Sequence, residues 1–339
     1  MPRISVILPV YNGALYIGEA VQSILSQSYS DFELIVINDA STDKTLEVLG
    51  NFTDPRLRIV TNEQNLRVVK SLNKGMALAQ GELVARMDGD DIAHPLRFEM
   101  QVAYLDAHPE VDFCGTWVEV FGAQQMISKC SEKHDLIKAH LFFLNSIYHP
   151  SVMFRRQRFV EHNLQYDESF TNAEDYGLWA KAIDVIQLAN VPKVLLKYRV
   201  HDSNVSVLKD SNRKVLDEIH YRVYKDFLDK LKINYNESDL ATHRALAIRE
   251  VDVSTEEQLL TYLRWMEKVY KANQATHYFN KTALQVVLMG CFNELMKRSK
   301  SSFRKSRMVL RSARSIFSPA DYVSIWRYKL SLKFTSGKV

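Results

Sequence analysis

A short acidic run holds the residues of this chain that most plainly could do chemistry. It reads Asp88-Gly89-Asp90-Asp91 and directly follows Leu83 to Ala85, an apolar stretch typical of a strand. Carboxylates packed this closely repel one another unless a cation lies among them. Oxygen ligands at this spacing suit Mg²⁺ or Mn²⁺, ions that commonly serve phosphate groups. The alternative is an acidic turn exposed to solvent.

Three further polar groups follow apolar runs or begin helices. Pro9 to Gly13 breaks a strand-like run, and its tyrosine could stack on a flat base, although a packed turn is the alternative. The first carboxylate of Asp39 to Asp43 could accept the imide proton of uracil, or this segment could cap a helix. Glu174 and Asp175 precede a helical pattern, where the helix dipole stabilises carboxylates and where one could act as a general base.

The elements that must position these groups alternate between strand and helix in the first half of the chain. Strand-like runs occupy Ile4 to Val10, Phe32 to Ile37, Leu57 to Val60 and Leu83 to Met87. Helical spacing covers residues 17–25 and 68–79, and Ser41 or Thr42 is predicted to cap a short helix. This order predicts a mostly parallel sheet with helices on both faces. Because ligands bind at the carboxyl ends of such strands, we expect Asp39 and Asp88 to line one crevice.

The rest of the chain changes character twice. Residues from about 111 to 201 mix short strands and helices, and helical patterns follow beyond Val207 without repeats or low-complexity segments. We therefore expect a catalytic domain over 1–205, a helical region over 206–295 and a basic tail over 296–339. Three cysteines without ligand spacing argue against a disulfide framework and suit a reducing cytosol. The sequence shows no leader pattern and no apolar run near the roughly 20 residues of a membrane span.

The tail carries most of the positive charge. Residues 297–339 hold twelve Lys or Arg and one acid, a net charge of +11. Because the whole chain carries +4, the remaining residues carry −7. Between Lys297 and Phe317 a single helix would separate apolar from basic side chains, and Tyr322, Trp326 and Tyr328 follow. Such a helix predicts binding to an anionic membrane surface, here the cytoplasmic face of the plasma membrane. The alternative is a helix packed on the protein with a solvated basic face.

Six motifs in order resemble the family 2 inverting glycosyltransferases. They are Pro9-Val10-Tyr11-Asn12, Ser23-Ile24-Leu25-Ser26-Gln27, Asp39 with Ser41-Thr42-Asp43, Asp88-Gly89-Asp90-Asp91, Glu174-Asp175 and Tyr198-Arg199-Val200-His201. The resemblance covers about residues 3 to 207 and implies the GT-A nucleotide-sugar-binding fold. Within the family, the chain looks most like bacterial enzymes that extend lipopolysaccharide, lipooligosaccharide or capsule glycans.

The resemblance implies roles for matching positions in the nucleotide site. Pro9 and Tyr11 match donor-site residues, with Tyr11 at the position that stacks on uracil. Asp39 matches the residue that bonds the imide edge of the base, and Asp88 the acid that contacts the ribose. Arg67 stands where a glycine is usual and would place a cation near the diphosphate or face solvent. Ala40 likewise replaces a usual glycine.

The same resemblance implies roles in the reaction. Asp90 matches the metal-binding acid, and His201 a histidine at the metal or diphosphate site. Asp175 matches the catalytic base, and Glu174 beside it would hold hydroxyls of the acceptor. These positions predict transfer from a UDP-sugar to a glycan or lipid-linked acceptor with Mn²⁺ or Mg²⁺. One base without a carboxylate nucleophile implies a single displacement with inversion.

Two other functions use part of this pattern. A sugar nucleotidyltransferase also needs acidic metal ligands, but it would carry a Gly-rich basic loop after the first strand, where this chain has Tyr11 to Leu15. A catalytically silent glycan-binding subunit would have no use for the complete set of acids. Nucleic-acid binding would explain the tail but leave the motifs unused, so no nucleic-acid partner is expected.

His149 before Pro150 is expected to be structural rather than catalytic. The oligomeric state is left open.

Overall fold

The computed structural model describes residues 1–170, 172–201, 213–304 and 306–318, together with residues 321, 323 and 325. The chain divides into two compact units. The first comprises Met1–Glu132 and Ile147–Asn212, and the second comprises Lys133–Ser146 and Arg213–Val339. This division differs from the expected one, because a segment from the first half joins the helical unit and the tail is not a separate region.

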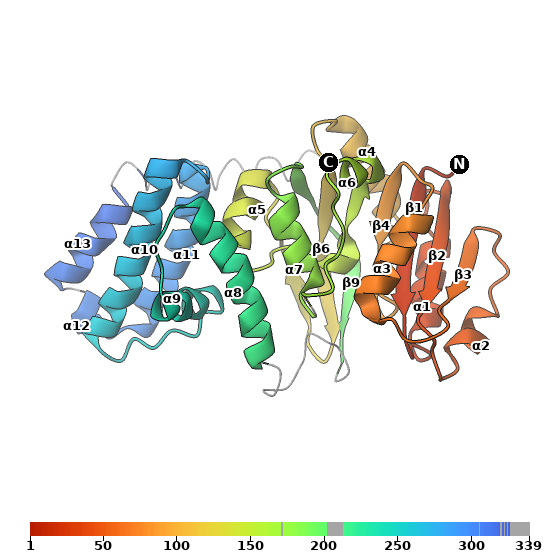
Figure 1. The fold of residues 1–339 in the computed structure, drawn as a ribbon, viewed down its shortest axis with the longest axis horizontal. Helices are drawn as coiled ribbons and strands as arrows, with labels where there is room; N and C mark the ends of the chain where they lie inside the picture. The colour runs from red at the N-terminus through yellow and green to blue at the C-terminus, as the bar shows by residue number, and fades with distance from the viewer. Residues whose placement is uncertain are drawn as a thin grey trace. The chain divides into compact units, whose positions relative to one another are not determined.

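The first unit is built on a mixed sheet that contains nine strands among the described residues, in the order β3-β2-β1-β4-β8-β6-β9-β5 with β7 paired to β6. Four strands are parallel and lie at one side of this sheet: β1 (Ile4–Val10), β2 (Phe32–Asn38), β3 (Leu57–Thr61) and β4 (Leu83–Arg86) (Figure 1). The remaining strands are β5 (Ile92–Ala93), β6 (Phe113–Gly122), β7 (Met126–Ser128), β8 (Met153–Arg155) and β9 (Leu188–Val200). The predicted parallel strands are thus present, in a sheet that also contains antiparallel pairs.

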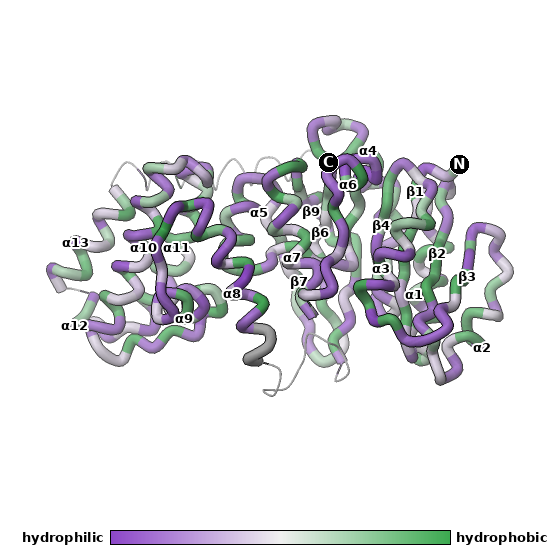
Figure 2. The backbone as a smooth tube through the Cα atoms, in the orientation of Figure 1, coloured by the Kyte–Doolittle hydropathy of each residue, from purple (hydrophilic) through white to green (hydrophobic). Residues whose placement is uncertain are grey.

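Helices cover both faces of the parallel strands, as predicted. The apolar strands form the green interior of this unit in Figure 2. On one face, Val6 and Leu8 of β1 join the core that contains the buried side of α1 (Ile17–Leu25). On the other face, a Cβ built on Gly75 of α3 (Arg67–Leu78) would lie 2.5 Å from Ile7. This close approach requires a residue without a side chain and brings α3 directly onto the central strand.

The predicted short helix is α2 (Thr45–Leu49), but neither Ser41 nor Thr42 caps it: its N-cap residue is Lys44, and no side chain makes a capping hydrogen bond there. Asp43 lies just before it, and its Oδ1 accepts the backbone N–H of Thr45 at 2.9 Å. Its Oδ2 accepts the N–H of Ala14 at 3.0 Å. A carboxylate can serve two donors at once, so Asp43 ties the loop after β1 to the start of α2.

Four more helical segments belong to the first unit. They are α4 (Arg97–Ala107), the 3₁₀ turn η1 (His149–Ser151), α6 (Arg156–Glu161) and α7 (Glu174–Ala182). The second unit contains α5 (His134–Leu141), α8 (Arg213–Lys230), α9 (Glu237–Ala247), α10 (Glu256–Thr276), α11 (Lys281–Arg298), α12 (Ser301–Arg304) and α13 (Arg307–Ile316).

A buried histidine explains why the 133–146 segment belongs to the helical unit. His243 of α9 lies 2.8 Å from the carbonyl of Phe142, which follows α5, and its Nδ1 accepts the indole N–H of Trp265 in α10 at 3.2 Å. Burial lowers the pKa of His243 to about 4. The neutral ring therefore satisfies both nitrogens and joins three segments that are distant in sequence.

The tail does not form the single helix expected from Lys297 to Phe317. Helix α11 ends at Arg298, Ser299 is extended, and Ser306 caps a separate α13. Val309, Ala313, Ile316 and Phe317 are buried, and the Phe317 ring lies 5.7 Å from that of Phe292 in α11. These apolar side chains are covered by protein, as in the packing alternative, and are not free to enter a lipid layer. Tyr322, Trp326 and Tyr328 lie outside the described residues. Among the residues that are described, no helix has the length and apolarity that a membrane span requires.

Candidate active site

A cleft of about 1090 Å³ opens at the carboxyl ends of β1 and β4 in the first unit. Its walls come from the loop after β1, the acidic run after β4, η1, the start of α7 and the end of β9. It brings together these predicted residues: Pro9, Tyr11, Asp88, Asp90, Glu174, Asp175 and His201. Asp39 and Arg67 do not line it. Most of the predicted site residues therefore line one continuous cleft.

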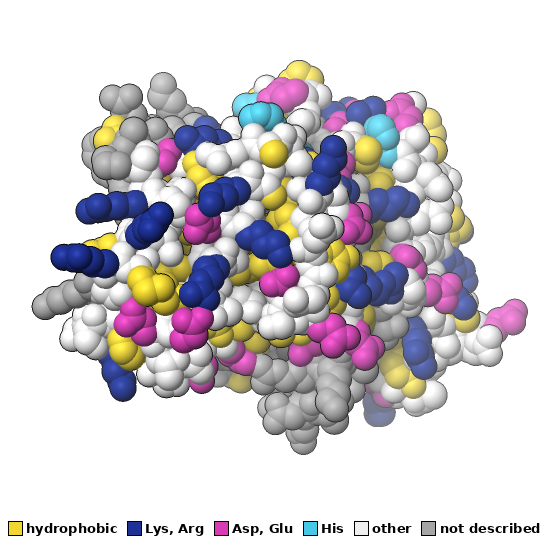
Figure 3. Space-filling model, turned by 60° about the vertical axis from the view of Figure 1, so that its left-hand side comes forward, with side chains coloured by type: hydrophobic (Ala, Val, Ile, Leu, Met, Phe, Trp, Pro, Cys, Tyr) yellow, Lys and Arg dark blue, Asp and Glu magenta, His cyan; other side chains and the backbone are white. Residues whose placement is uncertain are grey.

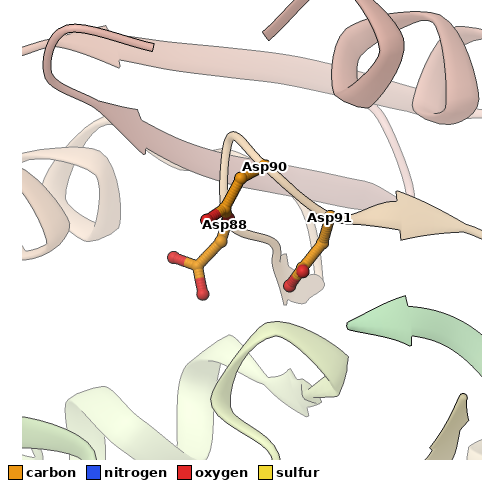
Figure 4. A group of neighbouring side chains, drawn as sticks. All are labelled: Asp88, Asp90 and Asp91. Atoms are coloured by element: carbon orange, nitrogen blue, oxygen red, sulfur yellow. The ribbon is translucent and has the colours of Figure 1, made fainter. Parts of the chain in front are cut away.

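The acidic run after β4 gathers its carboxylates on one side of a tight loop (Figure 4). One oxygen from each of Asp88, Asp90 and Asp91 lies within 4.8 Å of the others. Asp90 Oδ2 is 2.9 Å from Nε2 of His201, so the predicted pair is in contact. Asp91 is buried, and its Oδ2 has no hydrogen-bond partner among the described residues. Burial, and then Asp88 and Asp90, raise the pKa of Asp91 well above its usual range.

Buried arginines lie directly behind this run. Arg86, the last residue of β4, is 4% exposed, and its guanidinium pairs with both carboxylate oxygens of Asp88. Arg97 of α4 is fully buried and donates to the carbonyl of Arg86 at 2.8 Å. Burial lowers the pKa of Arg97 to about 9. Arg86 was not predicted from the sequence, although a basic residue in an otherwise apolar strand was the available sign of a buried ion pair.

The donor set of this run fits a hard divalent cation. The ligands are carboxylate oxygens with one imidazole nearby, and the unpartnered oxygen of Asp91 is a buried acceptor that lacks a donor. Desolvating such an oxygen without a partner is costly. Because Arg86 already neutralises Asp88, the charge left to compensate is concentrated on Asp90 and Asp91.

The second acidic pair stands at the start of α7, where the sequence placed it. The Glu174 side chain is 12% exposed, its Oε1 is 4.0 Å from Nδ1 of His149, and its Oε2 has no hydrogen-bond partner among the described residues. Burial, and then the charge of Asp175, raise the pKa of Glu174 to about 7. Asp175 Oδ1 accepts the N–H of Tyr176 at 2.7 Å. This wall of the cleft can therefore hold or release a proton near neutral pH.

His149 lines the cleft but is also tied into the structure. Its Nε2 is 2.8 Å from the hydroxyl of Tyr166, and its ring meets that of Trp179 edge-on at 5.9 Å. Asn73 of α3 fixes Tyr166 by two hydrogen bonds, one to its carbonyl and one from its N–H. Burial, and then Arg86, hold the pKa of His149 well below its usual range. A neutral His149 thus links α7 to α3.

The loop after β1 presents an exposed aromatic ring beside an asparagine that organises it. Tyr11 is 50% exposed. Asn12 has φ of 51°, its side-chain oxygen accepts the N–H of Thr42 at 2.8 Å, and its own N–H donates to Ser41 at 2.9 Å. Asn12 therefore joins the loop after β1, which carries Tyr11, to the loop after β2. The sequence predicted a turn here, and asparagine is one of the few residues that adopt this conformation readily.

Asp39 is buried next to the cleft rather than on its surface. Its N–H donates to the carbonyl of Val10, a residue of the cleft wall. Its Oδ1 accepts the side-chain amide of Asn62 at 2.7 Å and the N–H of Leu66 at 2.8 Å. One oxygen of Asp39 thus fixes the segment before α3.

The two departures from the family pattern share a backbone feature. Ala40 has φ of 57° and Arg67 has φ of 66°. Both stand where the family commonly has glycine, the residue that adopts this left-handed conformation at no steric cost. Arg67 is exposed at the start of α3. Both positions therefore hold the backbone conformation that glycine adopts most readily.

Comparisons with known proteins identify the family to which this sheet and cleft belong. The model of Glycosyl transferase family 2 matches residues 5–166. An uncharacterized glycosyltransferase of Haemophilus influenzae is 34% identical over 69% of this chain and 76% of its own length. The O-antigen biosynthesis glycosyltransferase WbnJ of Escherichia coli is 32% identical over 60% of this chain and 82% of its own.

A solved structure shares the fold. TarS residues 1–349 of S. aureus, in complex with UDP-GlcNAc, has a TM-score of 0.59 at 19% identity, covering 87% of this chain and 89% of that chain.

The family model and the Haemophilus influenzae relative show that the chain belongs to glycosyl transferase family 2.

Proposed function

We propose that this transferase moves a sugar from a UDP-sugar to a hydroxyl of a glycan or lipid-linked acceptor, with inversion and with a divalent cation. The observation that carries the proposal is the single cleft shared by the acidic run and the Glu174–Asp175 pair. One group suits a cation and the other suits a proton, which are the two requirements of this transfer. The relative WbnJ supports a place in cell-surface polysaccharide biosynthesis, and TarS with UDP-GlcNAc makes a UDP-sugar the first donor to test.

In the donor half of the cleft, Tyr11 stacks on the uracil and Pro9 borders the base. Asp39 accepts the imide proton through Oδ2, since its Oδ1 is occupied by Asn62 and Leu66. Asp88, held by Arg86, accepts from the ribose. Arg67 stands at the start of α3 as a cation for the diphosphate.

In the reacting half, Asp90 with His201 would hold Mn²⁺ or Mg²⁺, which supplies charge stabilisation for the diphosphate leaving group. Asp175 takes the proton of the acceptor hydroxyl as that oxygen attacks the anomeric carbon. Glu174 orients the acceptor hydroxyls. One displacement without a carboxylate nucleophile inverts the anomeric centre.

The first test screens UDP-Glc, UDP-Gal, UDP-GlcNAc and UDP-GalNAc for UDP release with Mn²⁺, with Mg²⁺ and with EDTA. Release from at least one donor that EDTA abolishes supports the proposal. Release of pyrophosphate from UTP and a sugar phosphate would indicate a nucleotidyltransferase instead. Binding of glycan without turnover of any donor would indicate a silent subunit.

Preference for uridine is tested by calorimetry with UDP and GDP. A carboxylate accepts from the uracil N–H, and another base leaves that contact unmade. We expect UDP to bind at least about 10-fold more tightly, roughly 1.4 kcal/mol. Equal affinities would remove the assigned roles of Tyr11 and Asp39.

We also propose a cytoplasmic enzyme that binds the inner face of the plasma membrane by charge. Arg307, Arg311 and Arg314 are exposed on α13, with Met308 and Leu310 beside them. The face in Figure 3 carries both signs of charge, with several Lys and Arg side chains standing out into solvent. Each basic residue near an anionic surface contributes roughly 1 kcal/mol.

Sedimentation with vesicles tests this association. The full chain should pellet with anionic vesicles at low salt and be released by high salt. Replacement of the three α13 arginines by glutamine should weaken pelleting, whereas Lys268→Gln with Lys271→Gln, whose side chains pair with acids, should not. If the wild-type chain does not pellet with anionic vesicles at low salt, the proposed membrane association is wrong.

A further inference from the structure

Arg199, near the end of β9, contacts the acidic run through both its backbone and its side chain. Its N–H donates to Asp91 Oδ1 at 2.8 Å. Its Nε donates to the carbonyl oxygen of Asp90 at 2.7 Å. The side chain is 15% exposed, so these bonds are largely shielded from water. Two consecutive residues of the acidic run are therefore held by one residue from a distant strand.

The guanidinium of Arg199 is itself fixed from three directions. Its Nη2 pairs with the carboxylate of Glu19 in α1. Its central carbon lies 4.5 Å from the ring centre of Tyr16 and 4.4 Å from that of Phe121 in β6. An arginine bound to a carboxylate and placed against two aromatic rings has little freedom to move. The acidic run is thus anchored to α1, β6 and β9 through one side chain.

This anchor acts on the peptide that carries the proposed cation ligand. Fixing the carbonyl of Asp90 fixes the direction in which its side chain leaves the backbone, and the bond to Asp91 Oδ1 fixes the orientation of the neighbouring carboxylate. Groups that orient metal ligands commonly change metal affinity by 10- to 100-fold when they are removed. Lysine cannot replace this arginine, since one ammonium cannot serve the Asp90 carbonyl and Glu19 in the same geometry.

We propose that Arg199 is a positioning residue for the divalent-cation site, and that it sets the affinity of the acidic run for the cation without touching cation or substrate. This inference rests on the cation site of the proposed function. A purely structural role would lower stability and leave the cation affinity of the folded protein unchanged. Arg199 was part of a motif in the sequence, but nothing in the sequence separated it from its neighbours.

The experiment measures Mn²⁺ binding to the full chain by electron paramagnetic resonance, which reports free aqueous Mn²⁺ and needs no turnover. Arg199→Lys should raise the Kd for Mn²⁺ by about 10-fold or more. Calorimetry in EDTA should show UDP binding within about 2-fold of the wild type. The matched control is Lys197→Gln, a basic residue two positions earlier on the same strand whose side chain pairs with Glu119 at 3.7 Å. It should leave the Kd for Mn²⁺ unchanged.

A second variant keeps the test decisive if Arg199→Lys does not fold. Glu19→Gln removes the carboxylate partner of the guanidinium, and the Glu19 side chain is 57% exposed, so the variant should fold. We expect it to raise the Kd for Mn²⁺ by about 2- to 5-fold, because the arginine loses one of its supports. Folded variants that bind Mn²⁺ as tightly as the wild type would overturn the role of Arg199 alone. A wild-type chain that binds no Mn²⁺ would overturn the cation site as well.

Discussion

Two groups of adjacent carboxylates face the same cleft, and their surroundings differ. The acidic run after β4 has a buried arginine paired to Asp88, a histidine on Asp90 and a backbone N–H on Asp91. The pair at the start of α7 has a half-buried Glu174 whose near neighbour is the neutral His149 at 4.0 Å. The first is a cluster of carboxylates with donors arranged around it, whereas the second contains a carboxyl group that keeps its proton up to about neutral pH.

Adjacent acids in a sequence therefore do not share one chemistry. Burial and two neighbouring carboxylates raise the pKa of Asp91, and a bound cation would relieve that repulsion. Burial, and then the charge of Asp175, raise the pKa of Glu174 in the same way, but Glu174 is not among the clustered carboxylates where the cation would bind. We therefore expect the two groups to respond differently to metal, to pH and to substitution.

The largest effect is expected from Asp90→Asn. This variant removes the charge that holds the cation while His201 remains, so turnover should fall on the order of 10³-fold or more, roughly 4 kcal/mol of transition-state stabilisation. The measurement is UDP release at saturating Mn²⁺, with Mn²⁺ binding followed in parallel. Full activity of the variant in EDTA would contradict the assignment of the first group.

Asp175→Asn should act on the second group without affecting the first. Loss of a general base lowers kcat by about 10² or more while donor and Mn²⁺ binding stay near wild type, because the base acts in the transition state. Steady-state kinetics and calorimetry separate these effects. Product NMR should show an anomeric configuration opposite to that of the donor, and retention would refute the single-displacement mechanism.

The sequence predicted the parallel strands and the gathering of motifs in the cleft because both depend on local patterns. Apolar runs define β1, β2 and β4, and parallel topology brings their carboxyl ends together. It could not identify Arg86 or Arg199, since their partners are set by strand pairing across distant parts of the chain. Nor could it show that Asp39 is buried beside the cleft, with one carboxylate oxygen bound to Asn62.

The tail and the domain division were harder to predict for another physical reason. The apolar side of α13 is equally typical of a helix that binds a membrane and of a helix that packs on protein. The two cases differ only in the surface that the apolar side contacts, which the sequence does not show. The buried contacts of Phe317 and His243 are tertiary packing that no local pattern encodes. The helix break at Ser299 likewise stands among residues with ordinary helical propensity.

Glu174→Gln should give the clearest pH effect. The folded pKa of about 7 lies above the usual 4.5 of a glutamate, so the folded state binds this proton more tightly than the unfolded state. Stability from Glu174 is thus fully present below about pH 4.5 and is lost as pH rises to about 7. The glutamine variant should match the wild type near pH 4 and exceed it by on the order of 2 kcal/mol at pH 8. Urea unfolding at both pH values measures this, and a variant that is less stable at pH 8 would contradict it.

The smallest effect is expected outside both acidic groups, at Ala40. Its φ of 57° places an alanine in the left-handed region, at a cost of roughly 1 kcal/mol that glycine would not bear. Glycine also makes the unfolded chain more flexible, which offsets part of the gain. Ala40→Gly should therefore stabilise the protein by at most about 1 kcal/mol and leave Mn²⁺ affinity and UDP release unchanged. Ala20→Gly, in the middle of α1 and equally small, is the matched control and should destabilise by about 1 kcal/mol. Equal losses of stability in both variants would show that the left-handed backbone at Ala40 is not strained.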